Sequence, residues 1–418
     1  MTGPLEGIRI ITFTQAWAGT SATEQLGFLG ADVIQIESLT HPDIWRGGFN
    51  GPMKAAAQPT DGPRKRPWNV ASAYNSVNLN KRAITIDVMH PDGLALFERL
   101  VPLADVIAEN FTPDVMRKWG LTYERLNELR PGIIVASLSA YGASGPLRNV
   151  RGIGGTMEPM SGLTSLLGYE SGRPMNSGSM IPDAIAGAWF AAAIVTAIRH
   201  RERTGEGQYI DLGMMEANAM LTGDALLEFT ANGRVRPRMG NRHPRLAPHN
   251  IYPTTNAGWL AVCVEDDDQW RALCEIVGDP AMSGDARFET TAARKANEAA
   301  LDDCIERWAG GQDAAAAEAA LLASGVPAAR VRLRAELLDH PALQERGFGV
   351  EVDYPEAGRQ RVAGTPWRMT RTDPEVSRPA PMLGEHSREV FAELLGMTDD
   401  EYEELVQAGI SGDELPGT

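Results

Sequence analysis

Asp183 is the residue in this 418-residue chain whose surroundings best suit covalent chemistry. It follows Pro182 and precedes an apolar run over residues 184–198, so the pattern predicts that it lies in the first turn of a helix. The helix dipole favours the charged form of a carboxylate at that position, and we expect Asp183 to be ionised at pH 7. An ionised aspartate beside glycine-permissive backbone can attack an activated carbonyl carbon. The alternative is an acidic side chain that only decorates a helix start.

Other sequence motifs for catalysis or cofactor binding are missing. The segment 14–19, after the first predicted strand, has one glycine where a dinucleotide fingerprint needs two or three. The sequence also lacks a phosphate-binding G-x-x-x-x-G-K-[ST] loop, an H-E-x-x-H pair and a G-x-S-x-G elbow. The three cysteines, Cys263, Cys274 and Cys304, have no C-x-x-C spacing. We therefore expect no metal site and no redox cofactor.

The charge balance limits the partners that the chain can have. It carries 39 Lys and Arg against 55 Asp and Glu, a formal net charge of −16. Binders of nucleic acid or of membrane surfaces present basic faces, so neither class is expected, and an anionic ligand would need a local basic pocket. The run 184–198 is shorter than the roughly 18–20 residues that span a bilayer, which favours a buried helix. No signal peptide is visible, and these features together predict a cytoplasmic protein.

The elements that must position Asp183 follow from apolar periodicity. Strands alternate with helices through the first third of the chain, which predicts an α/β, Rossmann-like domain with a mainly parallel sheet. We place that large domain at residues 1–222, a smaller α+β domain at 223–334, and a C-terminal segment that returns to the large domain at 335–418. Residues 42–75, rich in Pro and Gly and containing the basic cluster 64–66, are predicted to form a long surface loop.

Individual elements are predicted from the same patterns. The expected strands of the large domain are residues 8–13, 31–36, 83–88, 105–108 and 133–138, and its first helices are 20–29, 90–103 and 123–129. In the smaller domain we expect a hairpin over 251–264 and helices at 267–277, 292–309 and 312–323. Parallel sheets of this kind bind ligands at the carboxyl ends of their strands.

Motifs spread over nearly the whole chain resemble the family III CoA-transferases, the group that includes formyl-CoA, carnitine and benzylsuccinate CoA-transferases. The order and spacing of the motifs carry the resemblance more than any one of them. They include Leu29-Gly-Ala-Asp-Val-Ile-Gln-Ile-Glu37, Asn78-Leu-Asn-Lys-Arg-Ala-Ile84, Ala108-Glu-Asn-Phe111, Gly142-Ala-Ser-Gly-Pro146 and Thr204-Gly-Glu-Gly-Gln208. The resemblance implies an interlocked homodimer and a covalent acyl and CoA intermediate on Asp183.

The resemblance also implies which residues contact coenzyme A, the substrate that the acyl group arrives on. Trp17 and Ala18 would lie beside the thioester, and Lys118 replaces a family arginine near the phosphates. The complete set of implied CoA contacts is Trp17, Ala18, Arg46, Ile86, Asn110, Phe111, Lys118, Arg151 and Met214. Ser38 stands where relatives often have an arginine, so another cation must compensate. Arg46 or the 64–66 cluster is the expected replacement.

The predicted reaction is CoA transfer from an acyl-CoA donor to an acceptor carboxylic acid. Trp17 replaces a glutamine of formyl-CoA transferase, and Gly240-Asn-Arg-His-Pro244 stands in place of its glycine loop. Methionines near Asp183 in sequence, if they line the pocket, favour an apolar or aromatic acyl group over a compact diacid. Those methionines are Met157, Met160, Met175 and Met180.

Three other functions remain open from the sequence. A 2-methylacyl-CoA racemase is the nearest, but Ile153 occupies the position of the acid/base histidine that racemases use. The chain could also be a non-catalytic CoA-binding subunit of a heteromeric transferase. A nicotinamide-dependent oxidoreductase is suggested by the β–α–β opening and opposed by the missing glycine fingerprint.

Overall fold

The computed structural model describes residues 3–47 and 65–416, and it divides into two compact units. Unit 1 is formed by Met1–Leu163, Asn176–Ala231 and Pro341–Thr418, and unit 2 by Thr164–Met175 and Asn232–His340. The C-terminal part of the chain thus belongs to the same unit as the N-terminal part. The domain limits given above from sequence stay a prediction.

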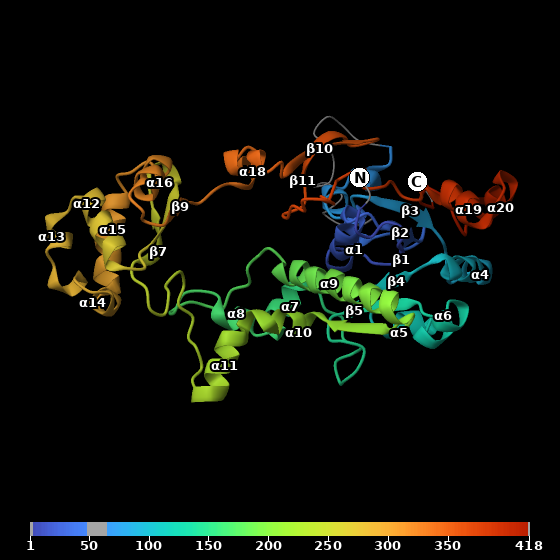
Figure 1. Ribbon diagram of the computed structural model, residues 1–418, viewed down its shortest axis with the longest axis horizontal. Helices are drawn as coiled ribbons and strands as arrows, with labels where there is room; N and C mark the ends of the chain where they lie inside the picture. Colours follow the sequence, from blue (N-terminus) through green and yellow to red (C-terminus); the bar gives the residue numbers. More distant parts are fainter. Residues whose placement is uncertain (1–2, 48–64, 417–418) are drawn as a thin grey trace. The chain divides into compact units, whose positions relative to one another are not determined.

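Unit 1 is built on a six-stranded sheet with the strand order β3-β2-β1-β4-β5-β6, and the labels of its first five strands follow one another in Figure 1. Every neighbouring pair is parallel. The strands are β1 (Arg9–Thr12), β2 (Asp32–Glu37), β3 (Lys81–Thr85), β4 (Val106–Glu109), β5 (Ile134–Ser139) and β6 (Tyr209–Gly213). The α/β prediction with a mainly parallel sheet is confirmed. The strand order reverses between β1 and β4, which is where sheets of this type form a ligand crevice.

Helices cover both faces of this sheet because its strands are apolar on both sides. On one face, α1 (Ala18–Phe28) and α9 (Ile181–Thr204) bury Leu26 and Phe190 against Ile10 and Ala136. The opposite face packs against α4 (Pro91–Leu100), α5 (Asp114–Lys118), α6 (Tyr123–Leu129), α19 (Ser387–Leu395) and α20 (Asp399–Gln407). The last two helices carry the C-terminal segment back to β3, as the red ribbon of Figure 1 shows.

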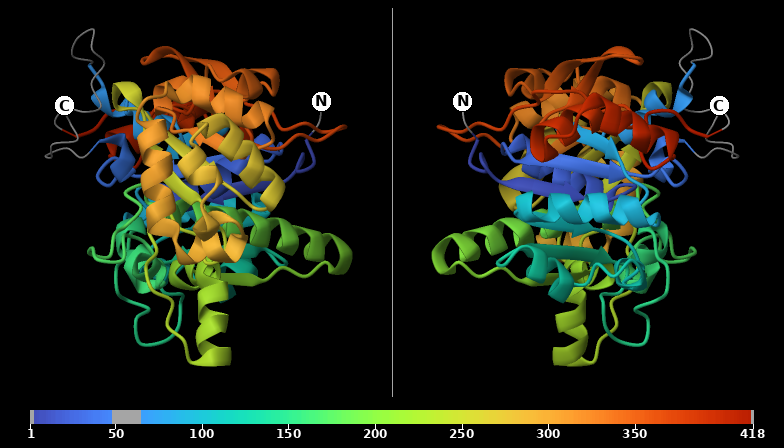
Figure 2. Two further views of the ribbon diagram at one scale, coloured as in Figure 1. Left: turned by 90° about the vertical axis from the view of Figure 1, so that its left-hand side faces the viewer. Right: turned by 90° about the vertical axis from the view of Figure 1, so that its right-hand side faces the viewer.

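Helix α9 is long and apolar enough to cross a bilayer by length and composition, yet half of its apolar window is buried inside the protein. The prediction of a buried helix is therefore right for one face only. The other face leaves Trp189 49% exposed. Short α10 (Met214–Ala219) follows β6, and α11 (Gly223–Asn232), which has no buried residue, projects from the rest of unit 1 in both views of Figure 2.

The segment after residue 64 differs from the predicted surface loop. Residues 65–80 contain α3 (Ser72–Asn75), and Trp68 and Tyr74 are 6% and 0% exposed. Tyr74 packs with Phe28 and with Tyr354 of a hairpin formed by β10 (Gly349–Tyr354) and β11 (Gly358–Ala363). Phe28 lies 46 positions before Tyr74 and Tyr354 lies 280 positions after it, so local composition could not reveal the burial. Residues 48–64, including Arg64 of the basic cluster, lie outside the described part.

Unit 2 is a small α+β unit, as predicted. Its sheet has the order β7-β8-β9, with β7 (His249–Pro253), β8 (Trp259–Cys263) and β9 (Ala328–Arg330) all antiparallel. The helices α12 (Asp267–Val277) and α16 (Ala314–Ala323) follow the predicted ranges closely. The single helix predicted over 292–309 is instead two helices, α14 (Thr291–Ala296) and α15 (Glu298–Ala309), which are separated at Asn297. Trp270, Leu273 and Ile305 form part of its separate core.

Candidate functional site

Asp183 lies in the first turn of α9, as its position after Pro182 predicts, and its side chain is 8% exposed. The residue before the helix, Met180, adopts a left-handed backbone conformation with φ +47°, and its carbonyl accepts the Asp183 N–H at 3.0 Å. Left-handed conformations of residues other than glycine cost free energy and need support from the surrounding structure. The surrounding structure therefore fixes the backbone at the start of α9, where Asp183 lies.

Burial sets the protonation behaviour of Asp183. Desolvation raises the pKa of its carboxyl group from 3.8 to about 6, and the N–H groups of Gly154 and of Asp183 itself partly offset the rise. With a pKa of about 6, about nine-tenths of the molecules carry the ionised form at pH 7. Oδ2 is buried and accepts no hydrogen bond from the described chain. A charged oxygen without a partner is poorly solvated and correspondingly reactive toward a carbonyl carbon.

Gly154 provides the space that this carboxylate occupies. It begins α7 (Gly154–Met160), and a Cβ added to it would stand 1.9 Å from Asp183 Oδ2. On the other side of the helix start, the amide of fully buried Asn218 donates to the Pro182 carbonyl at 3.2 Å and to the Met214 carbonyl at 2.7 Å. The first turn of α9 is thus held between α7 and α10. Met157 of α7 is 0% exposed and belongs to the core, so it does not line a pocket.

The loop between β1 and α1 carries Trp17, leads into Ala18 at the start of α1, and is clamped by Asn110. The Asn110 side-chain amide accepts from the Gln15 N–H and donates to the Gln15 carbonyl, both at 2.8 Å. Asn110 follows β4, so this clamp bridges the two strands at the point where the sheet order reverses. The Ala16 N–H donates to Asp43 Oδ1 at 3.0 Å. In a dinucleotide-binding fold the N–H groups of this loop face the pyrophosphate, whereas side chains already use two of them here.

The strongest cationic candidates from sequence, Lys118 and Arg151, are exposed residues of unit 1. Lys118 ends α5, on the sheet face opposite α9. Near it, a cavity of about 320 Å³ is lined by Arg117, Arg148 and buried Glu109, among other residues. Desolvation raises the pKa of the Glu109 carboxyl group to about 7. A ligand that joined Lys118 to Asp183 would have to cross the carboxyl edge of the sheet.

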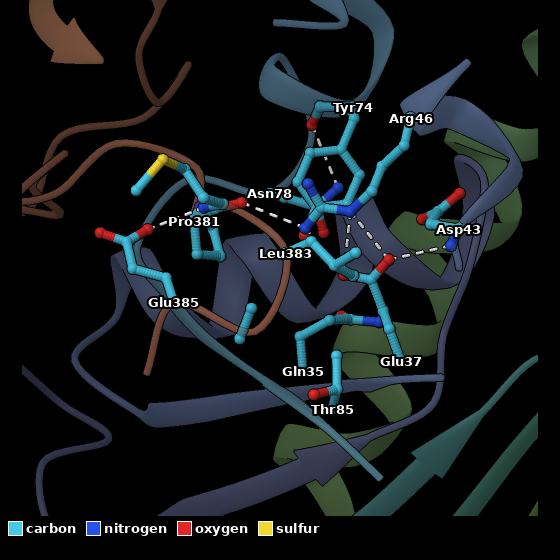
Figure 3. Close-up of polar contacts among 12 residues, drawn as sticks. Gln35, Glu37, Asp43, Arg46, Tyr74, Asn78, Thr85, Pro381, Leu383 and Glu385 are labelled. Carbon is cyan, nitrogen blue, oxygen red and sulfur yellow. Dashed lines mark hydrogen bonds and ion pairs between the residues drawn. The ribbon is translucent and has the colours of Figure 1, made fainter. Parts of the chain in front are cut away.

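Arg46 is not available to a phosphate, which corrects the expectation that it compensates for Ser38. Its guanidinium is 1% exposed, donates to Glu37 Oε1 at 2.7 Å, and stacks 3.6 Å from the centre of the Tyr74 ring (Figure 3). Arg66, from the described part of the basic cluster, pairs with Glu356 and, at 3.2 Å, with Asp413. Arg46 and Arg66 therefore neutralise acidic side chains of the protein itself.

The apolar residues of the implied CoA site divide into buried and partly exposed positions. Ile86 and Met214 are 1% and 5% exposed and lie inside the two cores of unit 1, so only their backbone could meet a ligand. Phe111 is half-buried and packs edge-on against Trp119 with ring centres 5.5 Å apart. Trp17 lies 5.7 Å from Trp45 by ring centres. Ala18 is buried at the start of α1.

Three residues around this site were missed by sequence reasoning. Gly154, Asn218 and Asp43 act through contacts with segments 27 to 36 positions away, so their own neighbours in sequence carry little signal. For Gly154 the pair Gly154-Gly155 was a usable clue, since glycine permits close approach of the backbone.

In unit 2, the segment that replaces the glycine loop lines two cavities of about 530 and 440 Å³. Arg242 borders both and pairs with Asp302 at 2.9 Å. Glu298 borders the smaller one, and its Oε1 atom is buried without a partner in the described chain. Within residues 3–47 and 65–416, no group of three His, Cys, Asp or Glu side chains could hold a metal ion.

Comparison with known proteins places these features in a family. The model of CoA-transferase family III matches residues 5–387. The succinyl-CoA–D-citramalate CoA-transferase of Chloroflexus aurantiacus is 33% identical over 95% of this chain and 96% of its own. The succinate–glutarate CoA-transferase of Agrobacterium fabrum is 34% identical over 94% and 96%. Among solved structures, a CaiB/BaiF family protein from Brucella suis superposes with a TM-score of 0.84 at 30% identity, covering 94% of this chain and 100% of that one.

Proposed function

The chain belongs to CoA-transferase family III, and on that basis we propose that it moves CoA from an acyl-CoA to a carboxylic acid through covalent intermediates on Asp183. The observation that carries the proposal is the buried Asp183 carboxylate at the start of α9, whose Oδ2 atom has no partner in the described chain. Its pKa of about 6 leaves it ionised at neutral pH while burial weakens its solvation. Both properties suit a nucleophile.

In the proposed first half-reaction, a carboxylate oxygen of Asp183 attacks the thioester carbonyl. The C–S bond breaks, CoA leaves as a thiolate, and an acyl–aspartyl anhydride remains. The thiolate then attacks the aspartyl carbonyl, which releases the donor acid and leaves an aspartyl-CoA thioester. The acceptor carboxylate repeats these steps in reverse order, so the enzyme returns to its starting state without a net change in protons or electrons.

We assign the developing oxyanion to backbone N–H groups near Asp183. One candidate is the Gly154 N–H, which already lowers the pKa of the Asp183 carboxyl group. The other candidates are the first N–H groups of α1, because the side chain of Trp17 at the helix start does not accept a hydrogen bond from them. For the CoA phosphates we keep Lys118 and Arg151 and add Arg148, which borders the cavity beside α5.

For substrates, we propose a succinyl group as the donor and a four- or five-carbon dicarboxylic acid as the acceptor. The names of similar CoA-transferases support this choice, since they pair succinate or succinyl-CoA with the five-carbon acids citramalate and glutarate and with the four-carbon acid L-malate. The proposal replaces the apolar acyl group expected from the methionines. Met157, one of the four, lies in the core and cannot contact a substrate.

The alternatives have less support. A racemase needs proton-transfer groups on both faces of the substrate α-carbon. Burial raises the pKa of Asp183 against the effect of two backbone N–H groups, with no neighbouring charge among the causes, and Ile153 is not titratable. Deuterium incorporation at the α-carbon without an acceptor acid would favour a racemase. An oxidoreductase is disfavoured because Asn110 and Asp43 occupy the loop N–H groups. Activity of the purified chain alone would exclude a non-catalytic subunit.

We also propose that the chain works as a homodimer. Large apolar side chains are exposed on the outer side of α9 and on the helical stretch that ends with α11, namely Trp189, Met220, Leu221, Leu226, Leu227 and Phe229. A patch of this kind usually marks a protein interface. The interlocked arrangement stays an implication of the family resemblance. A cytoplasmic location also stays a prediction, which cell fractionation can check.

The experiment that tests the proposed function is CoA transfer by the purified chain with succinyl-CoA and a panel of dicarboxylic acids. We expect the wild type to transfer CoA and Asp183→Ala to lose transfer by at least roughly a thousandfold, because the covalent route disappears. Circular dichroism should show an unchanged fold. Near-normal transfer by Asp183→Ala would overturn the assignment of the nucleophile, and no transfer to any dicarboxylic acid by the wild type would overturn the substrate class.

A further inference from the structure

The loop at residues 15–17 is held by side chains from neighbouring segments rather than by its own hydrogen bonds. Asn110 binds both the N–H and the carbonyl of Gln15, and Asp43 Oδ1 accepts from the Ala16 N–H at 3.0 Å. The same Asp43 oxygen accepts from the Trp45 N–H at 2.9 Å. One side chain thus ties this loop to the segment that follows β2.

Ala16 shows why such support is needed. Its φ of +61° lies in the left-handed region, which is unfavourable for a residue with a Cβ. Strained backbone persists where the surrounding contacts over-determine it, and such positions gather at functional sites. The next residue is Trp17, whose ring packs against Trp45. The hydrogen bonds of Asp43 and the ring contact therefore hold the same two segments together.

Asp43 is itself fixed by a buried ion pair. Its N–H donates to Glu37 Oε2 at 2.9 Å, and Glu37 receives Arg46 Nε and Nη2 in a bidentate pair, as Figure 3 shows. Arg46 also donates to the Pro381 carbonyl at 3.1 Å. Glu37, Asp43 and Arg46 are each at most 2% exposed. Burying charges costs free energy even when they are paired. An ordinary surface turn does not need a buried ion pair to hold it, so this pair indicates that the position of Asp43 matters.

The held loop leads directly into α1, which packs against α9, the helix that carries Asp183. Ala18 starts α1, and a Cβ added to Gly187 of α9 would stand 2.7 Å from the Ala18 carbonyl oxygen. Gly187 lies four residues, about one helical turn, after Asp183. A shift at the start of α1 would therefore displace Trp17 and press on the first turns of α9.

We propose that Asp43, together with Asn110, is a positioning residue for the transfer reaction, fixing the loop 15–17 against the helix that presents Asp183. The proposal rests on the proposed function of Asp183. The Asn110 amide acts by binding Gln15 rather than by touching CoA, which changes the role that the family resemblance implied for its side chain. Asp43 acts through its Oδ1 atom as an acceptor. Its Oδ2 atom makes no hydrogen bond within the described chain.

The test compares Asp43→Ala with the conservative variant Asp43→Asn. Asparagine keeps the Oδ1 acceptor and replaces only the oxygen that makes no bond. The control is Asp105→Ala, because Asp105 accepts the Arg9 N–H at 2.8 Å at the other end of the same strand β1. Two readouts are used, namely hydrogen–deuterium exchange of the peptide spanning residues 13–20 without substrate, and kcat and KM for CoA transfer.

We expect Asp43→Ala to speed exchange of that peptide and to lower kcat roughly tenfold to a hundredfold, with a smaller change in KM. Asp43→Asn should stay within about threefold of wild type in both readouts, because the hydrogen bonds to Ala16 and Trp45 remain. Asp105→Ala should leave exchange of the 13–20 peptide unchanged. If Asp43→Ala fails to fold, Asn110→Ala, which releases Gln15, is expected to speed exchange of the same peptide.

Wild-type exchange and kcat in Asp43→Ala would overturn the proposal, and so would an Asp43→Asn variant as impaired as Asp43→Ala. If Asp43→Ala does not fold, unchanged exchange in Asn110→Ala would overturn it. If the wild-type chain does not transfer CoA, the proposed function is refuted. The positioning role of Asp43 then has no reaction to support it. Failure of the two proposals is thus distinguishable.

Discussion

Replacing Asp183 with asparagine should stabilise the protein while it abolishes transfer. Burial raises the pKa of this carboxyl group from 3.8 to about 6. That difference, at about 1.4 kcal/mol for each pH unit, means that ionised Asp183 lowers the free energy of unfolding by about 3 kcal/mol at pH 7. Asparagine has nearly the same shape and never ionises, so the variant should recover most of that free energy. For a chain of this length we expect a melting temperature about 3 °C higher.

The raised pKa of Asp183 also determines how the stabilisation by Asp183→Asn changes with pH. Because the folded-state pKa is the higher one, the penalty is absent below about pH 4, grows as the pH rises, and is complete above about pH 6. The melting temperatures of wild type and Asp183→Asn should therefore converge toward pH 4 and separate toward pH 7. The matched control is Asp92→Asn, since Asp92 also follows a proline in the first turn of a helix but is exposed. Asp92→Asn should not stabilise the protein. A destabilised Asp183→Asn variant, or a difference that does not change with pH, would refute the reasoning.

Three further predictions follow from the same geometry. The value of kcat/KM should fall as the pH drops through about 6, about tenfold per pH unit below it, because protonated Asp183 is no nucleophile; a profile flat to pH 4.5 would contradict this. Gly154→Ala should lower kcat roughly a hundredfold, because its Cβ would clash with Asp183 Oδ2, whereas Gly155→Ala, whose Cβ meets nothing within 4 Å, should leave kcat unchanged; equal kinetics of the two variants would count against this contact. Trp189→Arg should weaken the proposed dimer at least roughly tenfold in sedimentation, whereas Trp259→Arg, at a tryptophan of similar exposure in unit 2, should not; an unchanged dimer in Trp189→Arg would exclude this face of α9 from the interface.

Five of the six strands of the parallel sheet could be predicted because each has a local signal, whereas β6, which is mostly exposed or half-buried, was missed. The predicted strands are short apolar runs bounded by glycine or polar residues. Helix α9 has Pro182 in its first turn and is followed by Gly205 in a left-handed conformation. The position of Asp183 at a helix start follows from the same signals. What could not be predicted is its burial, since the Gly154 contact that encloses Oδ2 comes from a segment 29 residues earlier.

The cations show the same limit more clearly. From sequence, Arg46 is one more positive charge in a loop, as available to a phosphate as Lys118. Its availability depends on Glu37, nine residues before it, and on Tyr74, which a distant hairpin buries. Pairing and burial are decided by tertiary structure, and residue type alone does not reveal them. Asp43 was overlooked for the same reason, because its role depends on the strained backbone of Ala16.

The most direct test of the account is mass spectrometry of the chain after brief incubation with succinyl-CoA and reduction by borohydride. An aspartyl-CoA thioester on Asp183 would be reduced at its carbonyl carbon, and the peptide that contains residue 183 would then carry homoserine in place of aspartate. We predict this conversion in the wild type and its absence when succinyl-CoA is omitted. An unmodified Asp183 in a chain that transfers CoA, or the reduced residue at another position, would contradict the central claim.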